Sequence, residues 1–448
     1  VIDRVVAINA ITQIDADAAK LDPLPQAIYY GLKGAPKSYF DIEAQSELVR
    51  RFGNEVAYKG GLDVLSTVDP QLQGLAEFAL QKHLLELDGA NGYRGPFAKL
   101  QLENEDWFDK FLDLHHPAMF VDWQIALVVE VRQEAAHIVL KNGSQGQITL
   151  WDMNWAGELD TTASWSKLPA NASQVLKVGD VVLVEKGNKS RTRQLKSQRD
   201  FLTYVSNAKR NFNTDLPRYK LRQLPKVSGA VVAMDPKTGE IKALVGGFSP
   251  QISKFNRASQ SLRQPGSTVK PFITLAALER GYDATSEIDD KEEEHILKGG
   301  EKWTPKNYDG KFLGKVSLEM ATIYSRNVPF VNLYFDLGKY RISNIMKRFK
   351  LYDETRVNPS MVLGANETSL MKLVAAYGAV ANHGVYNEPT TLRTVTDKEG
   401  LRLYSSQGGD IEDCQTYAFC NSNKVERVSQ PKATKALRRI LEKTMAFG

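Results

Sequence analysis

The sequence predicts an α+β protein of several domains, in which helices pack on an antiparallel sheet and a β-rich domain is inserted ahead of them. Apolar and polar residues alternate over much of 123–184, with glycine turns between the runs, which is typical of a small barrel or sandwich. Residues 227–247 form two more alternating runs around a Pro- and Gly-containing turn, the pattern of a hairpin. From residue 315 onward the apolar spacing is helical.

Length and composition indicate a globular protein of two to four domains. The chain has 448 residues, of which 42% are hydrophobic and 25% charged. Its net charge of +5 is compatible with an acidic partner but does not require one. No stretch approaches the ~20 apolar residues of a membrane helix, and no signal peptide opens the chain. Because it begins with Val1 and stops at Gly448 just after a helical pattern, we expect an internal piece of a longer protein.

The first ninety residues predict helices around one strand. Residues 1–20 have helical apolar spacing and carry no chemistry. A charged amphipathic helix is expected over 42–52, with Gly53 as its end. Residues 62–68 alternate like a strand, and Asp69-Pro70 then opens another helix.

A basic run in the β-rich region could bind nucleic acid if aromatic residues were interleaved with it. Its residues are Lys186, Lys189, Arg191, Arg193, Lys196 and Arg199. No aromatic residue is interleaved before Phe201, so a solvated loop is the better interpretation and no nucleic-acid partner is predicted.

The two cysteines, Cys414 and Cys420, are separated by five residues. A local disulfide and two free thiols are both compatible with this spacing. A metal site is not favoured, because no histidine or further cysteine lies nearby.

The strongest chemical signal lies around Ser267 and Lys270. Pro265-Gly266 forms a turn, and the apolar run behind it has helical spacing that ends at Gly281. Lys270 is then one turn after Ser267 on the same helix face, where a desolvated amine could take the serine proton. Lys270 precedes a proline, which disfavours the helical conformation that it needs, and local rules tend to be broken where chemistry requires it.

Ser-x-x-Lys alone is almost uninformative, because the chain contains two further matches. Ser164 to Lys167 lies in a polar segment with no helix start signal. Ser369 to Lys372 lies inside an amphipathic pattern, where both residues would be ordinary helix residues. Only Ser267 combines the Pro-Gly entry, the apolar helix and a second motif.

The second motif comprises Ser325 and Asn327, 58 and 60 residues after Ser267. It lies between two helical patterns, and Pro329 restricts Val328, so we expect a loop at the helix ends. Ser325 could relay a proton between the lysine and a leaving group, and Asn327 could hold a substrate amide.

With these motifs the chain resembles the class A penicillin-binding proteins, in the branch of penicillin-binding protein 1A, over nearly its whole length. The matching segments are Phe255-Asn256-Arg257-Ala258, Arg263-Gln264-Pro265-Gly266-Ser267-Thr268-Val269-Lys270-Pro271-Phe272, Trp303-Thr304-Pro305-Lys306-Asn307-Tyr308-Asp309-Gly310, Ser325-Arg326-Asn327-Val328-Pro329 and Ala375-Ala376-Tyr377-Gly378-Ala379-Val380-Ala381-Asn382-His383-Gly384.

The resemblance implies a transpeptidase domain of the penicillin-binding and serine β-lactamase-like fold, with an inserted OB-like β-barrel. It implies a serine D,D-transpeptidase that cross-links peptidoglycan stem peptides ending in D-Ala-D-Ala and is acylated by β-lactams, without a cofactor or metal. By the match Ser267 is the nucleophile and one oxyanion donor, Lys270 its base, and Ser325 and Asn327 the second element. Trp303 joins Ser267, Ser325 and Asn327 as a substrate-binding residue.

The family's third element departs from its usual place. Lys237-Thr238-Gly239 precedes the serine and falls in the hairpin turn, so it is interpreted as a turn only. We therefore expect the chain to lack the C-terminal Lys-Thr-Gly strand, and its activity is left open. It is also expected to lack the membrane anchor and most of the glycosyltransferase domain that the resemblance implies.

The expected domains are a glycosyltransferase remnant (1–20), a linking or transpeptidase-associated segment (21–89), an OB-like domain (90–225) and a truncated transpeptidase domain (226–448). The OB-like domain is expected to bind periplasmic regulators or cell-wall proteins. The parent protein is expected to be anchored in the bacterial inner membrane and to face the periplasm. A β-lactamase or D,D-carboxypeptidase, and a non-catalytic penicillin-binding scaffold, stay open as alternatives.

Overall fold

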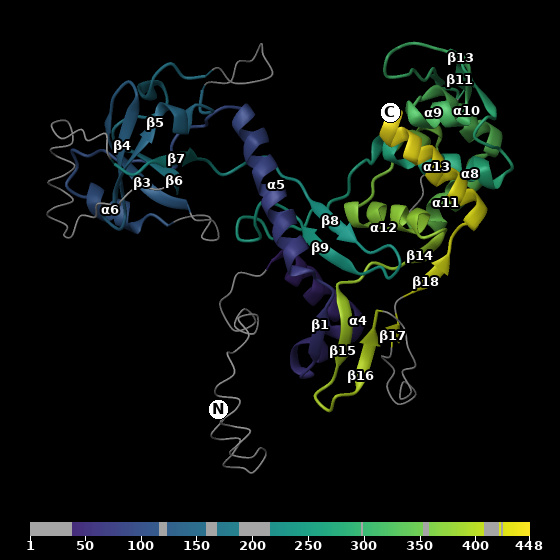
Figure 1. Cartoon of the computed structure of the whole chain (residues 1–448), viewed down its shortest axis with the longest axis horizontal. Helices are drawn as coiled ribbons and strands as arrows, with labels where there is room; N and C mark the ends of the chain where they lie inside the picture. Colours follow the sequence, from purple (N-terminus) through teal and green to yellow (C-terminus); the bar gives the residue numbers. More distant parts are fainter. Residues whose placement is uncertain are drawn as a thin grey trace. The chain divides into compact units, whose positions relative to one another are not determined.

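The computed structural model describes eight stretches of the chain, whose helices and strands are shown in Figure 1. They are residues 38–115, 123–157, 168–187, 216–296, 299–352, 358–406, 421–422 and 424–448. The predicted helix in 1–20, Cys414 and Cys420, the match at Ser164 and the basic run after Lys186 lie outside them. Among the helices that the structure describes, none is both long and apolar enough to cross a membrane.

The first described helix, α4 (Tyr39–Lys59), begins at a capping box. The Ser38 hydroxyl accepts a hydrogen bond from the Asp41 N–H, and the Asp41 carboxylate accepts one from the Ser38 N–H. The helix predicted over 42–52 is interrupted at Gly53, as expected, and a second helical segment follows it to Lys59. Gly53 has φ 78° and ψ 164°, which are not helical values. A glycine adopts this positive φ without a Cβ clash, and the residues after it restart the helix.

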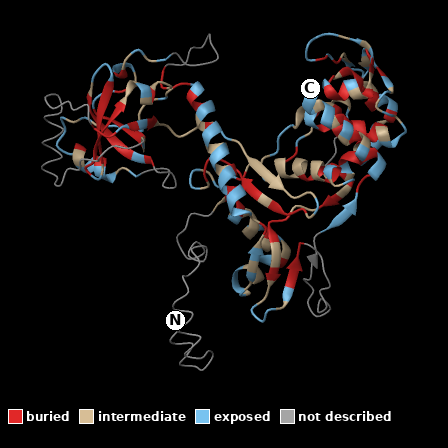
Figure 2. Cartoon of the chain, in the orientation of Figure 1, coloured by how far each residue is buried: buried red, intermediate tan, exposed pale blue. Residues whose placement is uncertain are grey.

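The strand and helix predicted next are both present. β1 (Asp63–Ser66) pairs antiparallel with β15 (Leu392–Thr396), far along the chain. α5 (Pro70–Ala90) begins at the predicted residue, since the Asp69 carboxylate accepts hydrogen bonds from the Gln71 and Leu72 N–H groups. Much of α5 is exposed (Figure 2).

The β-rich region forms one antiparallel sheet with cores on both faces. Its elements are β2 (Ala98–Lys99), α6 (Trp107–Asp113), β3 (Trp123–Val131), β4 (Ala135–Leu140), β5 (Gln145–Thr149), β6 (Asp180–Lys186) and β7 (Tyr219–Arg222). The strand order is β2-β6-β3-β4-β5, with β7 also paired to β6. Nearly every residue of β3, β4 and β6 is buried (Figure 2), because the alternate side chains enter two hydrophobic clusters.

The sheet does not close into the β-barrel that the resemblance implied. In the part of the chain that the structure describes, β5 meets the start of β7 through one isolated bridge, between Gln147 and Arg218. A ladder cannot extend from this bridge, because β5 ends at Thr149 and the chain turns into a short 3₁₀ helix at 150–153. Among the described residues, the OB-like region is therefore an open sheet in which β5 and the start of β7 pair only at this bridge.

The predicted hairpin is formed by β8 (Val231–Met234) and β9 (Ile241–Val245). Its turn contains Lys237-Thr238-Gly239, as the sequence indicated. The Asp235 carboxylate accepts a hydrogen bond from the Lys237 N–H at 2.8 Å, and Gly239 has φ 78°. α5 packs on β9, and α12 (Leu370–Ala381) packs on β8.

Helices dominate after the hairpin, as predicted, and short two-stranded ladders separate some of them. The helices are α8 (Lys270–Glu279), α9 (Leu318–Ile323), α10 (Val328–Leu337), α11 (Lys339–Arg348), α12 and α13 (Pro431–Phe447). The ladders are β10 (Glu287–Asp290) with β13 (Gly314–Ser317), β11 (His295–Ile296) with β12 (Lys302–Trp303), and β14 (Val385–Asn387) with β18 (Val425–Arg427). Two further strands, β16 (Arg402–Ser405) and β17 (Asn421–Ser422), extend the β1-β15 sheet.

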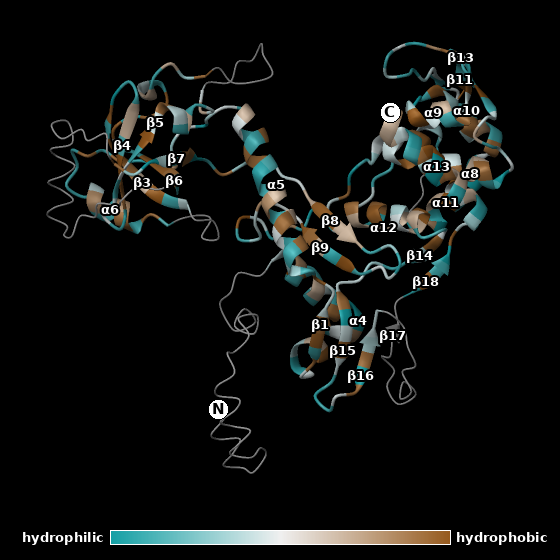
Figure 3. Ribbon diagram, in the orientation of Figure 1, coloured by the Kyte–Doolittle hydropathy of each residue, from teal (hydrophilic) through white to brown (hydrophobic). Residues whose placement is uncertain are grey.

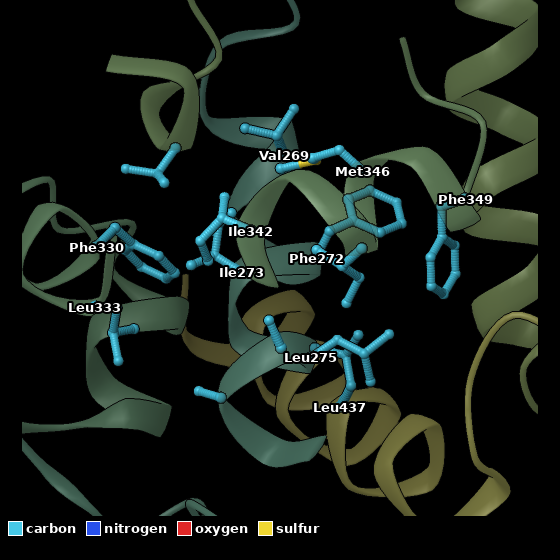
Figure 4. Packing of buried hydrophobic residues seen from close by; sticks show 14 of the residues in the cluster. Val269, Phe272, Ile273, Leu275, Phe330, Leu333, Ile342, Met346, Phe349 and Leu437 are labelled. Atoms are coloured by element: carbon cyan, nitrogen blue, oxygen red, sulfur yellow. The ribbon is translucent and has the colours of Figure 1, made fainter. Parts of the chain in front are cut away.

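α8 is the centre of the largest hydrophobic core. Eight of its ten residues are buried, and α9, α10, α11 and α13 all contact it. α13 alternates between hydrophobic and hydrophilic residues (Figure 3), with Ala433 and Leu437 in this core and Ile440 also buried. Phe272 lies among these helices (Figure 4), with its ring centroid 5.2 Å from that of Phe349. The first turn of α8, which carries the candidate lysine, is thereby fixed by packing.

Phe272→Ala tests this packing. Removing a fully buried aromatic side chain leaves a cavity, so we expect the free energy of unfolding to fall by about 3–5 kcal/mol. Denaturant unfolding followed by far-UV circular dichroism measures the change. Met445→Ala is the control, because that side chain is 90% exposed and its loss should leave the midpoint unchanged. Equal midpoints for both variants would contradict the assigned core.

Candidate active site

A short 3₁₀ helix (Gly266–Val269) leads directly into α8 and carries Ser267. Ser267 is exposed, whereas Lys270, the first residue of α8, is 1% exposed. Lys270 has helical φ and ψ of −55° and −38° although Pro271 follows it. The proline itself is tolerated there, because the N–H that it lacks would have no intrahelical acceptor in the first turn.

Backbone contacts with a distant segment fix this turn. Arg263 and Thr368 exchange two backbone hydrogen bonds of 2.9 Å, which pair the chain before Ser267 with the chain before α12. The Tyr377 hydroxyl, on α12, donates to the Thr268 carbonyl at 2.7 Å. The position of Ser267 is therefore set by tertiary contacts as well as by α8.

The second motif forms the predicted loop between α9 and α10. Ser325 has φ 51°, a left-handed conformation that is unfavourable for a residue with a Cβ. Its side chain and that of Asn327 come from the same short connection, and Asn327 occupies the position immediately before α10.

The loop holds the amine of Lys270. The Nζ atom donates to the Ser325 carbonyl at 2.6 Å, to the Ser325 hydroxyl at 3.2 Å and to Asn327 Oδ1 at 2.7 Å. It also lies 5.4 Å from the centroid of the Phe330 ring. Three acceptors match the three hydrogens of an ammonium group. The structure therefore brings together three of the predicted site residues.

Burial, together with the smaller effect of the nearby positive charge of Arg326, lowers the pKa of Lys270 to about 8. An amine with this pKa can release and accept a proton near neutral pH, which an exposed lysine cannot do. Among the hydrogen bonds of the described residues, none joins the Ser267 hydroxyl to Lys270. Ser267 is linked to Lys270 through the backbone, since its carbonyl accepts the Lys270 N–H.

Trp303 lies apart from this cluster in the contacts that the structure describes. It is half-buried on β12, its ring centroid lies 6.3 Å from that of His295, and it packs against the main core. No hydrogen bond, ion pair or ring contact between described residues joins it to Ser267, Lys270, Ser325 or Asn327.

Arg326 and Asn307, to which the sequence motifs gave no role, hold the Ser325–Asn327 loop in place. Arg326 is 8% exposed and ion-paired with Asp309 at 2.8 Å, and Asn307 accepts a hydrogen bond from the Asn327 N–H at 2.7 Å. Both lie inside motifs that carried the family resemblance, which was the available signal. No group of three or more potential metal ligands occurs in the described ranges.

Gly364→Ala tests how tightly the serine turn is held. Gly364 has φ 80°, and a Cβ there would lie 2.1 Å from the Gly266 carbonyl oxygen, which is backbone and cannot rotate away. Gly400→Ala is the matched control, because Gly400 has φ 85° with nothing within 4 Å. We expect the control to cost about 1–2 kcal/mol from φ alone, and Gly364→Ala to cost at least ~1 kcal/mol more in thermal or chemical unfolding. Equal costs would contradict a close contact at Gly266.

Comparison with protein families agrees with this geometry. Residues 229–446 match the penicillin binding protein transpeptidase domain, and residues 93–227 match the penicillin-binding protein OB-like domain. A penicillin-binding protein 1A of Rickettsia prowazekii is 33% identical over 378 residues, covering 84% of this chain and 43% of the relative. One of Vibrio cholerae is 29% identical over 454 residues, covering all of this chain and 52% of the relative. The chain thus spans about half the length of these relatives.

A solved structure supports the fold. The crystal structure of penicillin-binding protein 1A from Haemophilus influenzae superposes with a TM-score of 0.70 at 24% identity, covering 100% of this chain and 63% of that one. The two domain matches, the relatives and the shared fold agree with the motifs around Ser267 and Ser325. The chain therefore belongs to the penicillin-binding proteins, in the branch of penicillin-binding protein 1A.

Proposed function

We propose that this chain carries a serine D,D-transpeptidase site that cross-links peptidoglycan stem peptides through an acyl-enzyme at Ser267, and that β-lactams acylate the same serine. The observation that carries the proposal is the buried amine of Lys270, one turn after Ser267, with its pKa lowered to about 8. The names of the relatives and of both matching domains support penicillin binding.

In the proposed reaction the ammonium of Lys270 first loses a proton. The neutral amine then accepts the Ser267 hydroxyl proton while Oγ attacks the carbonyl carbon of the penultimate D-Ala. The C–N bond to the terminal D-Ala breaks, and the leaving amine takes a proton that the Ser325 hydroxyl relays from Lys270. An acceptor amine then attacks the ester carbonyl, the C–Oγ bond to Ser267 breaks, and the proton that the amine loses returns to Oγ through Lys270. The Ser267 N–H, in the first turn of its 3₁₀ helix, lacks an intrahelical acceptor and is suited to the oxyanion.

Asn327 is assigned chiefly to the lysine in this proposal. Its Oδ1 accepts from Lys270, and its Nδ2 donates to the Lys306 carbonyl at 2.9 Å. Contact with a substrate amide requires Nδ2 to leave that carbonyl. The assignment of Trp303 to substrate binding rests on its sequence motif.

The proposed domain organisation keeps the transpeptidase domain at 226–448 and the OB-like domain at 90–225. Residues 38–89 are assigned to the transpeptidase domain, because β1 pairs with β15 and α5 packs on β9. The OB-like domain is proposed to bind periplasmic regulators or cell-wall proteins. The whole protein is proposed to face the periplasm from an inner-membrane anchor and to carry a glycosyltransferase domain as well.

Intact mass after incubation with benzylpenicillin tests the nucleophile. We expect one penicilloyl adduct on the chain and none on Ser267→Ala. Ser369→Ala is the matched control, because this serine also precedes a lysine by three residues but its hydroxyl accepts the Lys372 N–H as a helix cap. Its loss should cost about 1 kcal/mol of stability and leave the adduct intact.

The other outcomes separate the alternatives. Rapid hydrolysis of the penicillin without a lasting adduct would favour a β-lactamase or D,D-carboxypeptidase. A folded chain with no adduct and no hydrolysis would contradict the transpeptidase proposal and favour a scaffold.

The pH dependence of acylation tests the base. Only the neutral amine can accept the serine proton, so the rate should be low below the pKa of Lys270 and rise through pH 8 to a plateau. With a pKa of about 8, the neutral fraction rises about fifty-fold between pH 6 and pH 8. Quenched-flow mass spectrometry at saturating penicillin gives the profile. A flat profile from pH 6 to pH 9 would contradict Lys270 as the base.

A further inference from the structure

One carboxylate in the acidic run at 289–294 is not on the surface. Asp290 is 0% exposed, whereas Asp289 beside it is exposed, because side chains alternate across β10. An ionised carboxylate in the interior is strongly unfavourable unless hydrogen bonds and an opposite charge compensate it. The partners of Asp290 therefore show what its burial accomplishes.

Both carboxylate oxygens of Asp290 are occupied. Oδ1 accepts a hydrogen bond from Asn307 Nδ2 at 2.6 Å. Oδ2 accepts one from Arg326 Nε at 3.0 Å and one from the Leu313 N–H at 3.2 Å. Two of these partners come from the loops that surround the candidate site, and Arg326 lies between Ser325 and Asn327.

Asn307 passes this restraint to the start of α10. Its Oδ1 accepts the N–H groups of Asn327, at 2.7 Å, and of Val328, at 3.2 Å. These are amide groups at a helix start, which lack intrahelical acceptors. Asn327 stands where a capping side chain belongs, yet its side chain makes no capping bond because it binds Lys270 instead. Asn307 supplies the cap from a distant part of the chain and leaves the Asn327 side chain free for the lysine.

Arg326 provides the second arm of the restraint. Besides Asp290, its guanidinium binds the Asp309 carboxylate at 2.8 Å and the Lys311 carbonyl. The fixed arginine anchors the loop in which Ser325 holds its left-handed conformation. It is also the charged side chain that acts on Lys270, and Asp290 and Asp309 are the carboxylates that face it.

We propose that Asp290 is a positioning residue for the acylation site: through Asn307 and Arg326 it fixes the Ser325–Asn327 loop so that three oxygens meet the Lys270 amine. The inference rests on the proposed function for its catalytic meaning, but the restraint itself belongs to the fold. Asp290 touches none of the proposed reacting atoms, so its effect is exerted entirely through these two side chains.

Asp290→Asn is the direct test, because an amide has one acceptor oxygen where the carboxylate has two. The amide oxygen can accept a hydrogen bond from Asn307 or from Arg326 but not from both in the native arrangement. The NH₂ group then faces the other donor. The charge of Arg326 is then opposed by Asp309 alone, which lowers the pKa of Lys270 further. For the full 448-residue chain we expect the plateau rate of benzylpenicillin acylation to fall about tenfold or more. The midpoint of its pH profile should move down by about half a pH unit.

Glu47→Gln is the matched control. Glu47 is also a buried carboxylate, 2% exposed, and accepts hydrogen bonds from the Thr391 N–H at 2.7 Å and from Arg51 at 2.8 Å. It holds α4 to the chain before β15, and among the described residues no hydrogen bond or ion pair joins it to the Ser325–Asn327 loop. We expect lower thermal stability with an unchanged plateau rate and midpoint. Loss of stability alone would lower the amount of active Asp290→Asn protein without moving its midpoint.

A second variant separates the two arms. Asp309→Asn removes a half-exposed partner of Arg326 and leaves Asn307 bound to Asp290. We expect its midpoint to shift downward with little loss of plateau rate. If Asp290→Asn does not fold, two other variants still test the proposal. An unchanged midpoint in Asp309→Asn overturns the effect of the Arg326 charge on Lys270. An unchanged plateau rate in Asn307→Ala overturns the role of Asn307 as the cap of α10.

Titration of Lys270 without turnover distinguishes failure of this inference from failure of the proposed function. Labelling with ¹³C,¹⁵N-lysine leaves the amine chemically unchanged, and NMR of the Lys270 Cε resonance, assigned by its absence in Lys270→Arg, gives the lysine midpoint in the parent chain and in Asp290→Asn. An unchanged midpoint overturns the inference even if penicillin acylates both proteins. A shifted midpoint in a chain that penicillin does not acylate supports the restraint and contradicts the transpeptidase proposal.

Discussion

The burial of the Lys270 ammonium is the constraint on which the rest of the candidate site depends. A cation that is 1% exposed loses its hydration and must find oxygen atoms within the protein. The Ser325–Asn327 loop supplies three of them, and two come from one residue, Ser325. This demand accounts for the left-handed Ser325, because the loop must aim a carbonyl and a hydroxyl at the same amine.

The same demand leaves the start of α10 without a cap from its own N-terminal residue. With its own N-cap side chain turned to the lysine, the helix takes its cap from Asn307, and Asn307 is held by Asp290. The Asn327 side chain binds Lys270, Asn307 then accepts the N–H groups at the start of α10, and the network ends at the buried Asp290 carboxylate, which binds Asn307. A site of this kind costs stability locally and relies on packing elsewhere, chiefly the core around Phe272.

Sequence reasoning succeeded where the determinants are local. The Pro265-Gly266 turn, the helix behind Ser267, the loop before Pro329 and the turn at 237–239 each follow from a few adjacent residues. It failed where distant contacts decide: among the described residues, the inserted sheet does not close into a barrel. Asp290 was missed for the same reason, since an acidic run is typical of a solvated surface.

One acceptor of the Lys270 amine, the Ser325 backbone carbonyl, cannot be predicted from a sequence pattern. Every residue has a carbonyl, so the Ser325 carbonyl gains its role only from a φ of 51° and from a loop anchored on both sides. Ser369, which matches the same Ser-x-x-Lys pattern, shows the converse: its hydroxyl is used to cap α12 by bonding the Lys372 N–H. The chemistry of such a motif is therefore set by the backbone geometry around it, and the serine and lysine alone do not define a site.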